Sequence, residues 1–301
     1  MSFIYILLIL NNNYLNGMIL ARVFNETLIT EGEIKMKNRI TKWIMGALLV
    51  LSVYSVHAVP VDVELILATD TSGSVDAVDF ALRRDGIEAA FRSPTVINAI
   101  ENGTIGSIAV TLWDFGTNVG VAVDWMQISN AAQANAFADA VAAAGRLGGG
   151  GDGQANMIRE ATIAITTNNY EGRGIIDITS EGVQSGEGCT YTSPDCQATR
   201  DAGAAFLAAG GSAINAIWMN DRNFFGLDQN DLVDAFEYGS LSVITGAGAF
   251  QVFAETNQDF IDAIDDKIIR EIQNPPTGVP TPGSLLLMAL GFVVFRLVRQ
   301  K

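Results

Sequence analysis

The chain has 301 residues, 49% of them hydrophobic, and 18 basic against 33 acidic side chains give it a formal net charge of −15. This apolar fraction supports a sizeable core and excludes wholesale disorder, while the acidity argues against a nucleic-acid partner, which needs a basic face. The single histidine, His57, lies in a segment that we expect to be removed, which excludes Ser-His-Asp catalysis and a His-ligated zinc site. Cys189 and Cys196 are too few for a four-cysteine zinc site.

The N-terminal part of the chain contains a sorting signal. Residues 36–58 combine basic side chains, an apolar run over 43–53 and a small residue, Ala58, at the cleavage position, which is typical of a signal peptide. The alternative is a membrane anchor, but the run is shorter than the roughly 20 residues that a span needs. Because a signal peptide starts a protein, we expect Met36 to be the true start and residues 1–35 to be an upstream extension.

Residues 59–274 form the predicted domain, in which short apolar strands alternate with helices. We expect strands over residues 61–69, 107–115, 118–125, 174–179, 212–219 and 249–255. We expect helices over residues 76–91, 130–144, 154–166, 195–209, 227–238 and 258–272. A tight turn joins the second and third strands, which predicts an antiparallel hairpin. The alternation predicts a doubly wound, mostly parallel α/β sheet with one antiparallel edge strand and helices on both faces.

Polar side chains follow the first strand, at the sheet edge where such folds bind ligands. Asp70, Ser72 and Ser74 place one carboxylate and two hydroxyls in a tight turn, and these oxygens can converge on a hard cation. The alternative is a helix N-cap, a position where Asp and Ser are common. The position of these residues at the end of a buried strand favours the cation site over the N-cap.

This segment resembles the metal-ion-dependent adhesion site of von Willebrand factor A domains. The stretch from Val61 to Ile100 also looks like an exported bacterial von Willebrand A-like family, and the resemblance covers about residues 61–272. It implies a von Willebrand A/Rossmann-like fold and two further ligands. Asp152, after the glycine loop 148–151, stands where the family has threonine, and Glu181 stands where it has aspartate.

The resemblance implies a divalent cation, Mg²⁺ or Ca²⁺. Three carboxylates in place of two should raise cation affinity and favour calcium, because ligand charge tunes affinity. They should also weaken the attraction for an acidic partner. Asp152 could instead be a helix cap or loop carboxylate, and Glu181 a solvated turn residue. Without a metal, converging carboxylates would repel each other, and the pKa of one would rise.

Three other features of the domain suggest structural roles. Cys189 and Cys196 flank six residues of the loop after Glu181, and in an exported protein we expect them to form a disulfide. The alternative is two unpaired thiols. Asp114 could support the site from behind, although a role in the hairpin turn is favoured, and Asp177 lies within an apolar strand, where it could be a buried hydrogen-bonding residue.

The C-terminus is a second sorting signal. Residues 275–283 are a proline-rich spacer, and residues 284–301 combine a short apolar helix with a basic tail, which is typical of a membrane helix with a cytoplasmic stop. The layout resembles the PEP-CTERM signal of exopolysaccharide-producing Gram-negative bacteria, although Thr281 stands where that motif has glutamate. The resemblance implies a sorting protease as a partner. The alternative is a simple tail anchor that is not cleaved.

Together these features predict an exported, non-catalytic interaction domain that binds a divalent cation. It would act in the periplasm, at the cell surface or in the extracellular matrix, and would bind a protein or polysaccharide. One alternative is an acidic structural matrix protein with a degenerate metal site. Another is a hydrolase that uses a metal-bound water. Partner binding that is lost in Asp70→Ala would support the cation-dependent interaction domain. Partner binding that is unchanged in Asp70→Ala would support the structural protein, and substrate turnover that depends on Asp70 would support the hydrolase.

Overall fold

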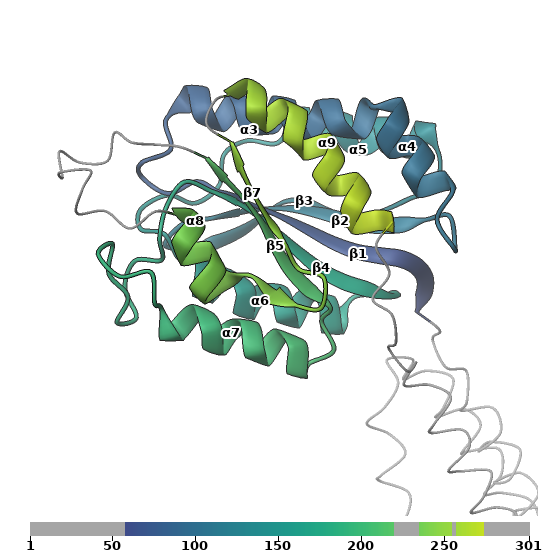
Figure 1. Ribbon diagram of the computed structural model, residues 1–301. Helices are drawn as coiled ribbons and strands as arrows, with labels where there is room; N and C mark the ends of the chain where they lie inside the picture. The colour runs from purple at the N-terminus through teal and green to yellow at the C-terminus, as the bar shows by residue number, and fades with distance from the viewer. Residues whose placement is uncertain (1–57, 220–234, 255–256, 274–301) are drawn as a thin grey trace, which may run out of the picture. The chain divides into compact units, whose positions relative to one another are not determined.

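A computed structural model describes residues 58–219, 235–254 and 257–273 of the chain (Figure 1). The strands are β1 (Val59–Asp70), β2 (Ile108–Phe115), β3 (Val119–Ile128), β4 (Tyr170–Ser180), β5 (Ala213–Met219), β6 (Thr245–Gly246) and β7 (Gln251–Ala254). The helices are α3 (Ala77–Arg92), α4 (Pro94–Glu101), α5 (Ala131–Ala143), α6 (Gln154–Thr167), α7 (Gln197–Ala208), α8 (Ala235–Tyr238), the π-helical turn η1 (Gly239–Val243) and α9 (Asn257–Gln273).

One sheet joins all the described strands. The order is β3-β2-β1-β4-β5, and both β6 and β7 pair with β5. The pairs of β1 with β2 and β4, of β4 with β5, and of β5 with β7 are parallel. The edge strand β3 runs antiparallel to β2. The predicted doubly wound, mostly parallel fold is therefore confirmed, with one difference: the two-residue strand β6 adds a second antiparallel pair.

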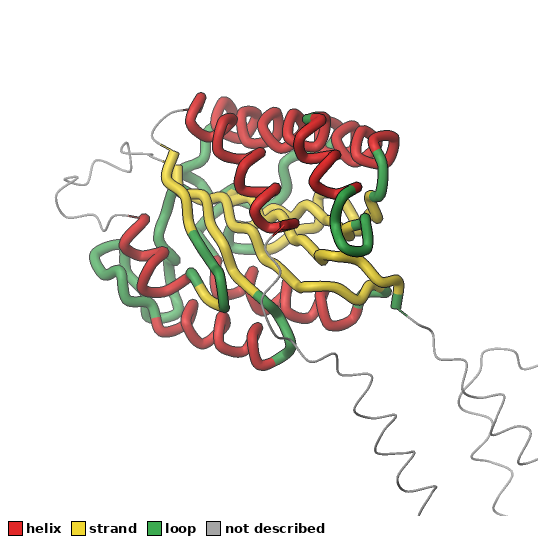
Figure 2. The backbone as a smooth tube through the Cα atoms, turned by 45° about the vertical axis from the view of Figure 1, so that its right-hand side comes forward, coloured by secondary structure: helices red, strands yellow, loops and turns green. Residues whose placement is uncertain are grey.

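Helices cover both faces of the sheet. Helices α3, α4, α5 and α9 lie on one face and α6, α7 and α8 on the other, with the strands between them (Figures 1 and 2). Strand β1 shows why its sequence is continuously apolar: Leu65 and Leu67 enter the core under α3 and α9, whereas Ile66 and Ala68 enter the core under α6 and α7. A central strand covered on both faces must be apolar at successive positions.

The structure differs from the predicted elements mainly at polar positions. The short helix α4 was not predicted; Pro94 opens it, at a position where proline is well tolerated. Strand β4 begins at Tyr170, four residues before the predicted start, because its first residues are polar and partly exposed and lack the apolar pattern. These errors affect element ends and one short helix, and they leave the order of the main elements unchanged.

Several predicted segments lie outside the described residues. These are the extension 1–35, the signal peptide apart from Ala58, most of the predicted helix 227–238, the spacer 275–283 and the C-terminal helix 284–301. Within the described part of the chain, no helix combines the length and apolar character needed to cross a membrane.

Candidate functional site

The turn after β1 gathers the first three predicted ligands. The Asp70 side chain is fully buried; its Oδ1 accepts a hydrogen bond of 2.8 Å from the Ser72 amide, and its Oδ2 accepts one of 2.8 Å from the Ser180 hydroxyl. The hydroxyls of Ser72 and Ser74 lie 3.2 Å apart. Asp76 caps α3 by accepting from two backbone amides of its first turn. The N-cap alternative therefore does not account for Asp70, Ser72 and Ser74, which lie before the capping residue at the carboxyl end of β1.

A glycine loop lies against this turn. The amide of Gly73 donates a 2.8 Å hydrogen bond to the Gly150 carbonyl, and Arg146 donates to the carbonyls of Thr71 and Ser72. Three successive glycines of the loop, residues 148–150, have φ values of 79°, 138° and 82°. Side chains disfavour that left-handed region, so the loop requires glycine there. The loop thereby delivers the next residue of the site, Asp152, beside the β1 turn.

Asp152 is a buried carboxylate with unused acceptor capacity. Its Oδ2 accepts a 3.1 Å hydrogen bond from the side-chain amide (Nε2) of Gln154. Its buried Oδ1 has no hydrogen-bond partner within the described part of the chain. Gln154 also donates to the Ser180 hydroxyl at 3.4 Å, and Ser180 donates to Asp70. A chain of hydrogen bonds therefore links Asp152 to Asp70. Buried acceptors are almost always satisfied, so the bare oxygen marks a place where a donor or cation fits.

Burial and neighbouring charges make the ionised form of Asp152 unfavourable in the absence of a cation. Burial raises the pKa of this carboxyl well above its usual value, and the charges of Asp70 and Glu181 raise it further, while the Gln154 hydrogen bond and Arg83 lower it. Ionising a buried carboxyl beside other carboxylates is unfavourable unless positive charge is supplied. The sequence analysis predicted this repulsion for converging carboxylates.

Glu181 follows β4 and is held by an arginine. Its carboxylate forms an ion pair with Arg83 of α3, and the two side chains are 3% and 0% exposed, so the solvated-turn alternative is wrong. Arg83 also donates a 2.7 Å hydrogen bond to the Asp70 carbonyl oxygen. Arg83 was not among the residues predicted from the sequence. Its spacing to Ile87 and Phe91 puts it on the buried face of α3, which was a usable signal for a buried cation.

A second buried ion pair lies beside the site. Asp114 near the end of β2 pairs with Arg84, and its Oδ2 accepts a 2.8 Å hydrogen bond from the Leu147 amide at the start of the glycine loop. Burial raises the pKa of Asp114, partly offset by Arg84. The favoured hairpin-turn role for Asp114 was wrong, because the residue lies within the strand and supports the loop from behind.

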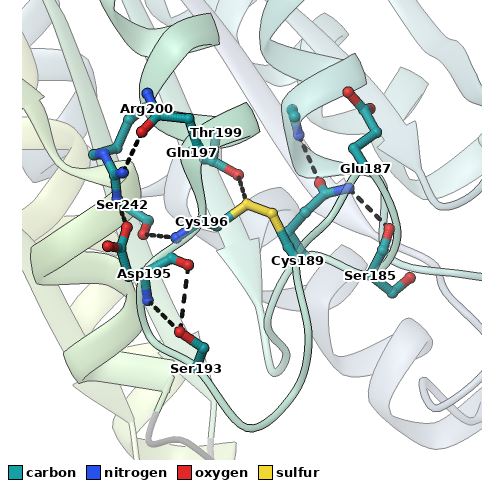
Figure 3. The surroundings of a disulfide bond; sticks show 12 residues. Ser185, Glu187, Cys189, Ser193, Asp195, Cys196, Gln197, Thr199, Arg200 and Ser242 are labelled. Carbon is teal, nitrogen blue, oxygen red and sulfur yellow. Dashed lines mark hydrogen bonds and ion pairs between the residues drawn. A yellow bond between two sulfur atoms is a disulfide. The ribbon is translucent and has the colours of Figure 1, made fainter.

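A disulfide closes the loop between β4 and α7. Cys189 and Cys196 are bonded, and the Cys196 amide donates a 2.8 Å hydrogen bond to the Ser242 hydroxyl (Figure 3). Earlier in the same loop, Ser185 bonds to the backbone of Asp152, donating its amide to the carbonyl at 2.9 Å and accepting the Asp152 amide at 3.0 Å. The cross-linked loop thus helps to position Asp152.

The donor set suits a hard cation. No three His, Cys, Asp or Glu side chains form a ready-made metal cluster in the ranges that the structure describes. Two of the five predicted ligands, Ser72 and Ser74, carry hydroxyls and so fall outside such a cluster. Asp70, the serine pair and the bare oxygen of Asp152 fit Mg²⁺ or Ca²⁺, both of which prefer oxygen ligands. Glu181 is paired with Arg83, and its charge acts on Asp152.

A match to a protein-family model shows which family this chain belongs to. The family described as "Protein of unknown function (DUF1194)" matches residues 60–276, and the chain therefore belongs to this family. No curated protein matches the sequence.

Solved structures resemble the fold at low sequence identity. The pilus adhesin SpaC from Lactobacillus rhamnosus GG is 14% identical with a TM-score of 0.50, and the match covers 71% of this chain and 31% of SpaC. A von Willebrand factor type A protein from Catenulispora acidiphila is 10% identical with a TM-score of 0.47, covering 71% and 43%. Proximal thread matrix protein 1 from the mussel byssus is 11% identical with a TM-score of 0.47, covering 71% and 49%. This chain thus spans about a third of SpaC, and the likeness concerns the fold alone.

Proposed function

We propose that this DUF1194-family protein is an exported, non-catalytic interaction domain that binds Mg²⁺ or Ca²⁺ at the carboxyl end of β1. Asp70, Ser72 and Ser74 would be direct ligands, and Asp152 and Glu181 would complete the shell directly or through water. The bare, buried Oδ1 of Asp152 beside the Asp70 turn is the observation that carries the proposal. A cation there would satisfy the oxygen and offset the repulsion between the two carboxylates.

The proposed partner is a protein or polysaccharide at the cell surface or in the surrounding matrix. The loops around the site, among them the glycine loop and the cross-linked loop after β4, would form the contact surface. SpaC, which has a similar fold, is described as a pilus adhesin. The proposal extends an adhesive role of this kind to the present chain. The signal peptide and the C-terminal sorting signal belong to the same proposal, since a matrix-facing role requires export. We propose no reaction at this site.

Thermal unfolding of the purified full chain tests the cation site directly. Calcium, magnesium and manganese are added separately to protein stripped of metal. A ligand that binds only the folded state at about 100 times its dissociation constant stabilises it by about 2.7 kcal/mol, so a clear rise in melting temperature is expected. The shift should disappear in Asp70→Asn, which loses a ligand charge while keeping the shape of the side chain.

The matched control is Asp85→Asn, since Asp85 is an exposed carboxylate on the same helix as Arg83. It should retain the full metal-induced shift. If no ion shifts the melting temperature of the wild type, the metal-dependent proposal fails and the acidic structural role leads. If ions bind, capture of matrix polysaccharide or surface protein is then compared with and without a chelator.

A further inference from the structure

Arg83 is a positive charge built into the candidate site. The side chain is fully buried, and it reaches two of the site's segments from α3. Its Nη2 pairs with the Glu181 carboxylate after β4, and its Nη1 donates a 2.7 Å hydrogen bond to the Asp70 carbonyl at the end of β1. A buried guanidinium must be paired and hydrogen-bonded to be tolerated, and here its partners are parts of the site itself.

The charge balance of the site depends on this arginine. Asp70, Asp152 and Glu181 bring three carboxylates to one buried region, and Arg83 is the cation that pairs with one of them. A metal ion entering the site would compete with the guanidinium for Glu181. While the ion pair persists, the oxygens left for an ion would be those of Asp70, Asp152 and the two serines.

We propose that Arg83 is a resident cation that keeps Glu181 from binding the metal directly and so sets the affinity of the site for divalent ions. This inference rests on the proposed cation site and names the residue that tunes it. Arg83 is a positioning residue, because it acts through Glu181. Its removal should let Glu181 join the ligands and tighten metal binding, since ligand charge raises cation affinity.

Calorimetric titration of the full chain with Ca²⁺ and with Mg²⁺ tests this role, with circular dichroism to verify folding. Arg83→Gln is expected to bind the ions at least roughly tenfold more tightly than the wild type. Arg83→Lys keeps the charge and should stay close to the wild type. Arg92→Gln is the control for loss of one positive charge, because Arg92 lies on the same helix α3 but is exposed and pairs with Glu88 and Asp139 instead. It should leave the affinity within a few-fold of the wild-type value.

Glu181→Gln and the double variant separate a released ligand from a general charge effect. On the proposal, Glu181→Gln weakens binding by less than about tenfold, because the residue is not a direct ligand in the wild type. In a chain that already carries Glu181→Gln, adding Arg83→Gln should no longer raise the affinity for the metal ion. The double variant removes both partners and leaves no buried charge unpaired, so it decides the question even if Arg83→Gln alone does not fold. Binding at least roughly tenfold tighter by the double variant than by Glu181→Gln would overturn the proposal.

The outcomes also separate this inference from the proposed function. If the wild type binds the ions and Arg83→Gln binds them more tightly, both the proposed function and the inference about Arg83 are supported. A wild type that binds no ion while Arg83→Gln does would refute the proposed function yet support the inference, with Arg83 taking the place of the metal. Equal or weaker binding by Arg83→Gln, with Arg83→Lys unchanged, overturns the inference alone. No binding by any variant overturns both.

Discussion

At the scale of single residues, charge is concentrated in a second buried cluster, away from the turn after β1. Lys267 of α9 is fully buried and pairs with Asp177 of β4 and, at 2.8 Å, with Glu271 one turn along the helix. Asn215 of β5 donates a 2.9 Å hydrogen bond to Glu271. Asp177 was expected to be a buried hydrogen-bonding residue; the structure shows it buried, in an ion pair. The cluster joins α9 to two central strands.

The pKa values of this cluster predict a pH-dependent stability. Burial and the charge of Asp177 raise the pKa of Glu271 to about 7, although Lys267 and Asn215 act against the rise. Burial would lower the pKa of Lys267, but the charges of Asp177 and Glu271 raise it overall, so the lysine stays charged. Between the ordinary carboxyl pKa of 4.5 and about 7, folded Glu271 holds a proton that the unfolded chain has lost.

The free energy of unfolding should therefore fall as pH rises from 5 to 8, by a few kcal/mol from this site. Glu271→Gln should remove that part of the decline, because glutamine does not titrate. Urea unfolding of both proteins across this range, without metal, gives the comparison. Asp152 titrates in both proteins, so the difference between their slopes belongs to Glu271. Identical slopes would contradict the raised pKa.

At the scale of elements, the loop from β4 to α7 connects the disulfide to the candidate site. The loop carries Glu181, bonds through Ser185 to Asp152, and ends at the cysteine pair. Gln184 accepts a 2.8 Å hydrogen bond from the Ala155 amide in the first turn of α6. The loop therefore ties the start of α6 to the end of β4, and its order matters for the placement of Asp152.

Replacing both cysteines by serine should lower the free energy of unfolding by about 2 kcal/mol or more, as expected for a short cross-linked loop. If the loop helps to position Asp152, the double variant should also bind calcium several-fold more weakly. Denaturant unfolding and calorimetry measure the two effects separately. Thr192→Ser, at an exposed position inside the same loop, is the control and should change neither. Lower stability with unchanged calcium affinity would confine the disulfide to a structural role.

Packing between elements explains a glycine in the middle of α3 that no sequence pattern indicated. Gly86 faces the ring of Phe260 in α9, and a Cβ built on Gly86 would lie 2.5 Å from that ring. Glycine inside a helix weakens it, so its presence here reflects the close approach of the two helices. The contact holds α9 against the helix that supplies Arg83.

At the scale of the whole molecule, two hydrophobic cores lie on opposite faces of the one sheet. One core fills the space under α3, α4, α5 and α9, and the other fills the space under α6 and α7. The central strands contribute alternate side chains to each. The two cores therefore share one sheet, and neither can be lost without exposing a face of the strands that support the other.

This arrangement predicts that residues 59–274 fold without the rest of the chain. Scanning calorimetry should show one cooperative transition whose calorimetric and van't Hoff enthalpies agree. Its melting temperature should lie within a few degrees of the main transition of the full chain. Two separate transitions, or a melting temperature far below that of the full chain, would show that segments outside this range contribute to stability.

The sequence by itself determined the sheet, the order of its main elements and the place of the candidate site. Strands covered on both faces need unbroken apolar runs, and the run of β1 ends at Asp70, so local patterns carry this information. The antiparallel hairpin of β2 and β3 was equally predictable, because a short turn joins neighbouring segments.

Only the tertiary structure decided which charges meet. Arg83 and Glu181 are 98 residues apart. The pairs of Arg84 with Asp114 and of Lys267 with Asp177 also join different elements. Ion pairs of this kind depend on how helices lie across a sheet, which no local periodicity encodes. For that reason the sequence predicted three carboxylates at one edge of the sheet but not the buried arginine that pairs with one of them.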